Sequence, residues 1–172
     1  MRVRWVLAVF LSSTVAPASA FAQATSSPSF EIQAMDGRCV QVYGGQATVG
    51  APIQLNTCGN AANNIWRYEN HEFIGLGKMC LQAWGGIPGH VGTPIKLNVC
   101  STTGTPAANN SWKFTESYRD AKFIEGEGGR CLQVYGGFGQ AGLGLNQCGP
   151  AANNAWRLID PSTGNAIPFP KD

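Results

Sequence analysis

Six cysteines, two histidines and a close pair of glutamates carry the most reactive side chains of the chain. The histidines, His71 and His90, stand in unlike surroundings, and no Gly-x-Ser-x-Gly or His-Glu-x-x-His motif supplies a nucleophile or a metal-bound water. Glu125 and Glu127 lie in a Glu-Gly-Glu-Gly-Gly stretch, which predicts a turn with solvated carboxylates. We therefore expect no enzyme, and the chemistry left to the chain is disulfide formation and non-covalent binding.

The first 22 residues have the pattern of a secretory signal peptide. A basic start precedes the apolar run Trp5–Leu11, and small residues follow up to Ala20 and Ala22, where cleavage is expected. The apolar run is far shorter than the ~20 residues that a membrane helix needs. We predict residues 1–22 as a signal peptide and a secreted or periplasmic protein without membrane insertion.

The mature chain has no net charge. Removal of the signal peptide takes Arg2 and Arg4 from the 12 basic residues, so that 10 remain beside 10 acidic ones. A neutral chain offers no extended basic face for nucleic acid or for an anionic membrane. We therefore expect neither of these partners.

The cysteines could bind a metal or form disulfides. No Cys-x-x-Cys pair and no cluster of histidines supplies a tetrahedral ligand set, so we predict no metal and no cofactor. An exported chain of this size favours disulfides, for which the cysteine count alone leaves many pairings open.

One segment occurs three times in the chain. Each copy contains Cys-[Val/Leu]-Gln-[Val/Ala]-aromatic-Gly-Gly, then an apolar-x-Leu-Asn-x-Cys run, then Ala-Ala-Asn-Asn-x-Trp. The copies begin these runs at Cys39, Ile53 and Ala61, at Cys80, Ile95 and Ala107, and at Cys131, Leu143 and Ala151. A single domain over 30–159 is expected, with repeats at about 30–70, 71–116 and 118–159 and an extended, Pro-rich tail over 160–172.

Short stretches of alternating apolar and polar residues predict strands within each copy. Val40 and Val42 alternate with polar residues, as do Ile53 and Leu55, and Gly, Asn and Pro fill the stretches between such runs. No window shows a period of 3.6 residues, so we expect no helices in the mature domain. The prediction is an all-β fold of three pseudo-symmetric repeats, about four strands each, closed into a barrel with hairpins capping one end.

The repeat also predicts how the cysteines pair. Each copy contributes two cysteines, 17 to 20 positions apart, and equivalent loops should close in equivalent ways. The expected disulfides are Cys39 with Cys58, Cys80 with Cys100, and Cys131 with Cys148.

The repeated Cys-[Val/Leu]-Gln, Gly-Gly, apolar-x-Leu-x-x-Cys and Asn-x-Trp motifs resemble the repeat of ricin B-chain type lectins. The resemblance runs from Phe30 to about Ile159, and it implies a β-trefoil that binds sugars in up to three shallow pockets, one per repeat. Where the family usually has Gln two places before the Trp, this chain has Asn, whose amide is expected to tie the repeat backbone while the Trp packs in the core. These residues are Asn64, Asn110 and Asn154, followed by Trp66, Trp112 and Trp156.

Two features of the family's sugar site are replaced in every repeat. Gln41, Gln82 and Gln133 stand where galactose-binding members have an Asp, and a neutral amide accepts weaker hydrogen bonds but can also donate. Asn56, Asn98 and Asn146 stand where an aromatic ring stacks on the sugar. Tyr43, Trp84 and Tyr135, each before a Gly-Gly pair, are candidates for a replacement wall, with packing beneath the loop as the alternative.

Other site positions are retained. Asn63, Asn109 and Asn153 match the Asn that binds a ring hydroxyl in the family, the alternative being that they satisfy only the backbone of a turn. Gln54 matches a further polar position, which Lys96 and Gly144 replace in the later repeats, so the first repeat is the best candidate pocket by a small margin.

The resemblance implies a monomeric, non-catalytic protein with up to three weak, equivalent sites that gains strength by multivalent contact with glycans on a glycosylated surface. The Gln substitutions argue against galactose. The alternative is a protein-binding or toxin-accessory trefoil with degenerate sugar pockets, whose ligand is a partner protein. Against it stands the recurrence of the same substitutions in all three copies, because decay should differ between repeats.

Overall fold

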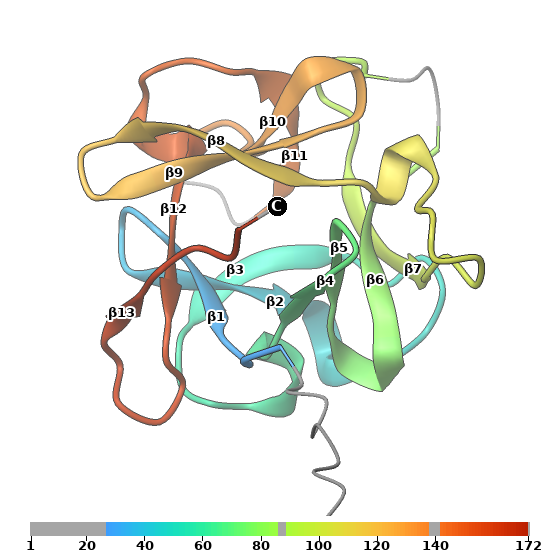
Figure 1. Ribbon diagram of the computed structural model, residues 1–172, viewed down its shortest axis with the longest axis horizontal. Helices are drawn as coiled ribbons and strands as arrows, with labels where there is room; N and C mark the ends of the chain where they lie inside the picture. The colour runs from blue at the N-terminus through green and yellow to red at the C-terminus, as the bar shows by residue number, and fades with distance from the viewer. Residues whose placement is uncertain (1–26, 86–88, 138–141, 172) are drawn as a thin grey trace, which may run out of the picture.

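Four strands from each repeat build the domain in the computed structural model, which describes residues 27–85, 89–137 and 142–171 (Figure 1). The predicted signal peptide lies outside these residues. The first repeat contributes β1 (Glu31–Ala34), β2 (Arg38–Val42), β3 (Ile53–Thr57) and β4 (Arg67–Glu69). The second contributes β5 (Glu72–Ile74), β6 (Met79–Ala83), β7 (Ile95–Val99) and β8 (Lys113–Tyr118). The third contributes β9 (Ala121–Gly126), β10 (Arg130–Val134), β11 (Leu143–Gln147) and β12 (Ala155–Ile159), and a short β13 (Ala166–Ile167) follows.

The described residues contain no α-helix, which confirms the predicted all-β class, and their helical segments are single 3₁₀ turns. Three of these turns contain the Ala-Asn-Asn motif, one per repeat, and the others join strands or follow a hairpin strand. They are η1 (Tyr43–Gly45), η2 (Ala62–Asn64), η3 (Leu76–Lys78), η4 (Ala108–Asn110), η5 (Glu127–Gly129) and η6 (Ala152–Asn154). No helix among the described residues is long and apolar enough to cross a membrane.

The first and fourth strands of the repeats close a six-stranded barrel. Between repeats, β4 pairs with β5, β8 with β9, and β12 with β1, all antiparallel. Within repeats, β12 pairs with β9, Phe30 and Trp66 exchange backbone hydrogen bonds, and the Trp112 N–H donates to the carbonyl of His71. The last strand of the barrel thus returns to the first, as the blue β1 beside the red β12 shows in Figure 1.

The second and third strands of each repeat form the hairpins β2–β3, β6–β7 and β10–β11, which cap one end of the barrel. Single backbone bridges join the three hairpins to one another, at Pro52 with Lys96, Pro94 with Gly144, and Gln54 with Gly142. Each hairpin therefore has one face toward the barrel core and the other toward solvent.

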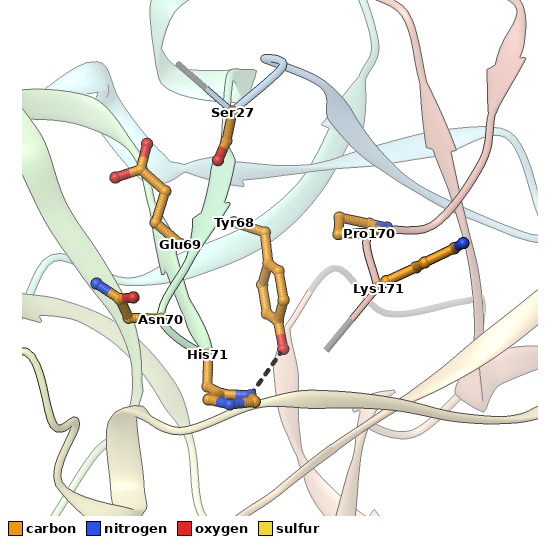
Figure 2. Close-up of a pocket in the computed structure, with 7 residues that line it drawn as sticks. All are labelled: Ser27, Tyr68, Glu69, Asn70, His71, Pro170 and Lys171. Atoms are coloured by element: carbon orange, nitrogen blue, oxygen red, sulfur yellow. Dashed lines mark hydrogen bonds between the residues drawn. The ribbon is translucent and has the colours of Figure 1, made fainter. Parts of the chain in front are cut away.

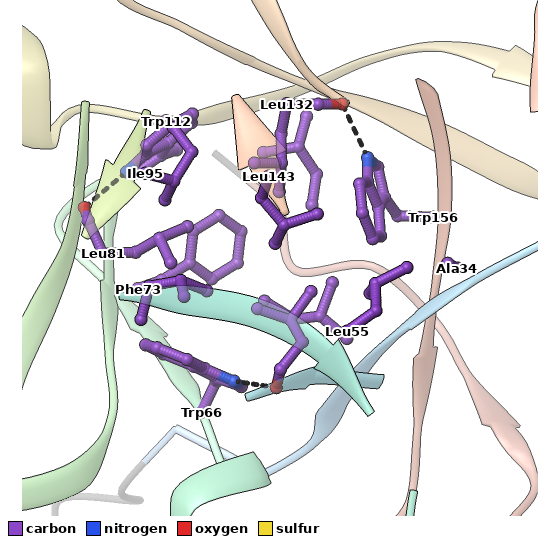
Figure 3. Close-up of a cluster of buried hydrophobic side chains, with 14 of the residues drawn as sticks. Ala34, Leu55, Trp66, Phe73, Leu81, Ile95, Trp112, Leu132, Leu143 and Trp156 are labelled. Carbon is purple, nitrogen blue, oxygen red and sulfur yellow. Dashed lines mark hydrogen bonds between the residues drawn. The ribbon is translucent and has the colours of Figure 1, made fainter. Parts of the chain in front are cut away.

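Three tryptophans, one at the end of each repeat's Asn-Asn motif, pack in the core as predicted (Figure 3). Trp66, Trp112 and Trp156 are almost completely buried, and each indole N–H donates to a carbonyl of its own repeat's cap hairpin. The acceptors are the carbonyls of Val40, Leu81 and Leu132, at 2.9 to 3.0 Å. The tryptophans thus connect the barrel to the cap while burying large apolar rings.

Two glycines allow the tryptophans to lie close to the next repeat. A Cβ at Gly75 or Gly126 would lie 2.6 Å from the ring of Trp66 or Trp112, respectively. At the third joint the equivalent residue is Ala34, which faces Trp156 across β1 and β12. The barrel joints therefore share one geometry with different residues.

The three predicted disulfides are confirmed, and the described residues include no free cysteine. Each bond joins the first strand of a cap hairpin to the residue just after the second strand. At the C-terminal end, β13 pairs with β12, and Phe169 packs its ring 5.0 Å from that of Phe114.

Candidate functional sites

The outward faces of the cap hairpins gather the residues predicted to form the sites. In the first hairpin Val40 and Val42 are buried in the core, so the alternating side chain of Gln41 points outward. The register places Gln41 opposite Gln54, Gln82 opposite Lys96, and Gln133 opposite Gly144. The predicted site residues therefore share one face in each repeat, but the residue beside the Gln differs in each.

The three Asn residues that replace the family's stacking aromatic ring form different hydrogen bonds. Asn56 and Asn146 accept a hydrogen bond from the N–H of the following residue at 2.8 Å. Asn98 instead donates its amide to Oε1 of Gln82, which is buried. In the third repeat, Oε1 of Gln133 is buried without a hydrogen-bond partner among the described residues. The same residue types thus recur in the three repeats, while the hydrogen bonding of their side chains differs, and the three equivalent sites stay a prediction.

The first Asn of each Asn-Asn pair ties its 3₁₀ turn to the tip of the cap hairpin. Asn63 donates to the carbonyl of Val42 at 3.1 Å, and Asn109 and Asn153 donate to the equivalent carbonyls of Ala83 and Val134 at 3.5 Å. The backbone therefore uses the donor side of these amides. The acceptor oxygen is the part of each side chain that a ligand hydroxyl could use.

The second Asn of each pair ties the same turn to the end of the hairpin, as predicted from the sequence. Asn64, Asn110 and Asn154 are buried and donate to the carbonyls of Thr57, Val99 and Gln147, respectively. Their role is structural.

The three aromatic residues at the hairpin tips differ in their surroundings. Tyr43 and Tyr135 are 58% and 50% exposed. A Cβ at Gly50 would lie 3.5 Å from the ring of Trp84, and one at Gly92 would lie 3.3 Å from the hydroxyl of Tyr135, so these rings contact the preceding repeat's loop. Tyr135 also lines a hollow with Pro94 and Leu143. Tyr43 and Tyr135 therefore remain accessible and do not pack beneath the loop, whereas Trp84 is half-buried.

A hollow that contains predicted site residues lies in the second repeat. Gln82 and Asn98 line it from the hairpin, and Asn110 lines it from the Asn-Asn turn. The remaining wall is the loop Ser101–Pro106. The preference for the pocket of the first repeat, which rests on Gln54, stays a prediction beside this hollow of the second repeat.

Two buried glutamates behind the hairpin ends escaped the sequence analysis. Glu31 Oε1 accepts hydrogen bonds from the N–H groups of Gly59 and Asn60, and Glu72 Oε1 accepts one from the N–H of Ser101 at 2.9 Å. Each carboxylate also accepts from the buried amide of its repeat, and the third repeat has Phe123 at this place. The sequence feature that could have revealed them is a Glu eight residues before the first Cys in two of the three repeats.

Glu125 does not lie in a solvated turn, which corrects the sequence prediction. It belongs to strand β9 and pairs with the ammonium of Lys113 at 2.9 Å, because the β8–β9 register places the two side by side. Glu127 begins the 3₁₀ turn η5.

Another hollow lies between the β4–β5 turn and the two ends of the described chain (Figure 2). Its lining includes Tyr68, His71, Ser27 and Lys171. The Tyr68 hydroxyl donates to the carbonyl of Trp112 at 2.7 Å and lies 3.3 Å from Nδ1 of His71. None of the residues predicted to bind a ligand lines this hollow.

The sequence matches the family model of the ricin-type beta-trefoil lectin domain over residues 28–160. The chain belongs to the ricin-type β-trefoil lectin family. It is 35% identical to Nigrin b of Sambucus nigra over 79 residues, which cover 46% of this chain and 13% of Nigrin b. The match therefore spans a small part of that relative.

Solved structures agree with this membership at the level of the fold. The designed three-fold symmetric protein ThreeFoil superposes with a TM-score of 0.69 at 15% identity, covering 77% of this chain and 98% of ThreeFoil. A non-toxic homologue of type II RIPs from Momordica charantia, in complex with α-methyl-D-galactoside, gives a TM-score of 0.64 at 21% identity over 78% of this chain and 48% of its own. The β-trefoil prediction is thereby confirmed.

Proposed function

We propose that this chain is a secreted, non-catalytic lectin that binds glycans weakly at up to three sites, one on the outward face of each cap hairpin. The observation that supports this most is the recurrence, in every repeat, of a Gln and a nearby Asn on the same hairpin face and of an aromatic ring at the hairpin tip, which is exposed in the first and third repeats. Amides that donate and accept, next to an aromatic ring, suit the hydroxyls and apolar ring face of a sugar.

Galactose is not the ligand that this arrangement favours. The bitter gourd homologue was solved with a galactoside, but the carboxylate that its family uses for a pair of hydroxyls is Gln here. A neutral amide accepts weaker hydrogen bonds than a carboxylate, so a ligand that also accepts from the amide is favoured. Several weak contacts on one surface then add through multivalency, with a monomer as the unit of binding.

Secretion is the second part of the proposal. The N-terminal sequence supports it, as do the three disulfides, since such bonds persist in oxidising compartments.

The test is a glycan array probed with the oxidised mature protein, presented as a multimer so that weak sites register. We expect a coherent set of bound glycans, and a stepwise loss of binding when Tyr43, Trp84 and Tyr135 are replaced by Ala one after another. The control is Val49→Ala, which removes a side chain that is similarly exposed, at 56%, but is not part of the proposed sites.

The opposite result has a clear meaning. If folded protein binds no glycan on the array, the lectin proposal is wrong, and a partner protein becomes the ligand to seek on the same three hairpins.

A further inference from the structure

The second repeat carries a loop that the other two lack. Asn109 follows Cys100 by nine positions, whereas the equivalent Asn follows its Cys by five positions in the first and third repeats. Of the four additional residues, Thr102–Thr105, the three threonines form part of the wall of the hollow beside Gln82 and Asn98. The extra length therefore converts an open hairpin face into a walled site.

The loop is internally hydrogen-bonded and presents hydroxyl groups. The Ser101 hydroxyl donates to the carbonyl of Thr105 at 2.7 Å and lies 3.1 Å from the hydroxyl of Thr103. On the opposite wall, the buried Asn110 ties the turn to the hairpin, so the polar groups open to a ligand come from the loop and from the hairpin face. The hollow thus presents loop hydroxyls and the amides of Gln82 and Asn98, which suit a neutral, hydroxyl-bearing ring.

A cation lies next to the hollow on the same hairpin face. Lys96 is the cross-strand partner of Gln82, and its Nζ lies 4.9 Å from the centroid of the Trp84 ring. No carboxylate of the described residues forms an ion pair with Lys96, and the other repeats have Gln54 and Gly144 at this place. The cation–π contact with Trp84 holds the ammonium beside the site without neutralising it.

The buried Glu72 disfavours a ligand anion at the loop end of the site. Its carboxylate lies directly behind the wall, accepting from the N–H of Ser101 and from the amide of Asn110. An anionic group inside the hollow would be repelled by this carboxylate, whereas one beside Lys96 would be attracted. Asn98 lies opposite Cys80, four residues before Trp84 along the hairpin. This separation corresponds to ~13 Å, so the hairpin face is longer than one sugar ring.

We infer that the second repeat binds an acidic saccharide, with a neutral sugar unit in the hollow and a carboxylate or sulfate group on the next unit against Lys96. Trp84 is the positioning residue for the ammonium. This inference rests on the proposed lectin function and assigns the ligand class of one of its sites.

The experiment compares paired glycans that share a neutral core and differ in one acidic group: neutral oligosaccharides of several core types, their carboxylate-bearing forms and their sulfated forms. Binding is measured in a Tyr43→Ala, Tyr135→Ala background, so that the second repeat dominates. We expect the acidic forms to bind tighter than the neutral ones. Lys96→Gln should weaken their binding roughly three- to tenfold and leave the neutral forms unchanged. High salt should have a similar effect.

Two variants complete the design. Lys113→Gln removes a lysine that already pairs with Glu125 elsewhere on the barrel, and it should leave the preference for acidic glycans intact. Deletion of Thr102–Thr105 leaves Cys-Ser-Pro-Ala-Ala-Asn, which matches the length of Cys148–Asn153 in the third repeat. It should weaken the binding of acidic and neutral glycans alike, while the oxidised protein stays folded by circular dichroism.

Each other outcome overturns the inference. Three results contradict it and leave the lectin proposal standing: glycan binding without an acidic preference, an acidic preference that survives Lys96→Gln, or glycan binding that the loop deletion does not weaken. Absence of binding to any glycan by the unmodified protein contradicts both. A difference between the carboxylate and sulfate arms identifies which anion the site takes.

Discussion

At the scale of single residues, the contacts between glycine and tryptophan at the barrel joints give a sharp stability prediction. Gly75→Ala and Gly126→Ala each place a methyl group 2.6 Å from an indole ring, in a core that cannot shift without loss. We expect each change to lower the free energy of unfolding by ~1–3 kcal/mol, measured by urea denaturation. Gly59→Ala, where a Cβ meets nothing within 4 Å, is the matched control, and an equal loss there would refute the steric explanation.

The buried glutamates give a second prediction at this scale. Glu72→Ala removes the acceptor for the N–H of Ser101 and for the amide of Asn110. Because buried donors without partners are costly, we expect a loss of ~1–3 kcal/mol in unfolding free energy. Glu72→Gln keeps an oxygen at the same place and should lose less. Equal losses in the two variants would show that the charge, not the acceptor, is what the fold requires.

At the scale of elements, the three disulfides close loops of nearly equal length, 19, 20 and 17 residues. On the chain-entropy model each should contribute about 3 kcal/mol, and the loop lengths alone separate the three by only ~0.1 kcal/mol. Replacing each cysteine pair in turn by alanines and measuring chemical unfolding tests this. A much larger spread would mean that native packing, such as that of Phe123 near Cys131, decides the contribution.

The strands, hairpins and disulfide pairing are also the features that the sequence predicted most fully. Strands, cap hairpins and disulfide pairs follow from one motif that occurs three times, because each copy supplies the same alternation and the same loop. The buried Glu31 and Glu72 could not be read in this way: a polar residue in an alternating strand is ordinarily exposed, and here the loop after the second Cys folds over it. The hydroxyl-bearing wall was likewise missed, since its residues have no counterpart in the other copies.

At the scale of the whole molecule, the barrel closes by pairing its last strand with its first, and Ser27 and Lys171 line the same hollow (Figure 2). A circular permutant that joins these ends and opens the chain between Asn70 and His71 keeps every repeat and every strand. We expect it to unfold in one cooperative transition in calorimetry. A fragment of the last two repeats leaves β5 without β4 and β12 without β1, which opens the barrel, and we expect the fragment to remain unfolded. Stable folding of that fragment would show that the repeats are independent.

The walled hollow of the second repeat is built from parts that all belong to that repeat: its loop, its Gln82–Asn98 pair, its lysine and tryptophan, and the glutamate behind them. Gene duplication could therefore multiply it as a unit. A protein assembled from three copies of this repeat would keep a glycine against a tryptophan at every joint, and it would present three identical hollows around one axis. Such a protein would bind best to a surface on which identical ligands are regularly spaced. In the natural chain, by contrast, the face of the second repeat differs from the other two.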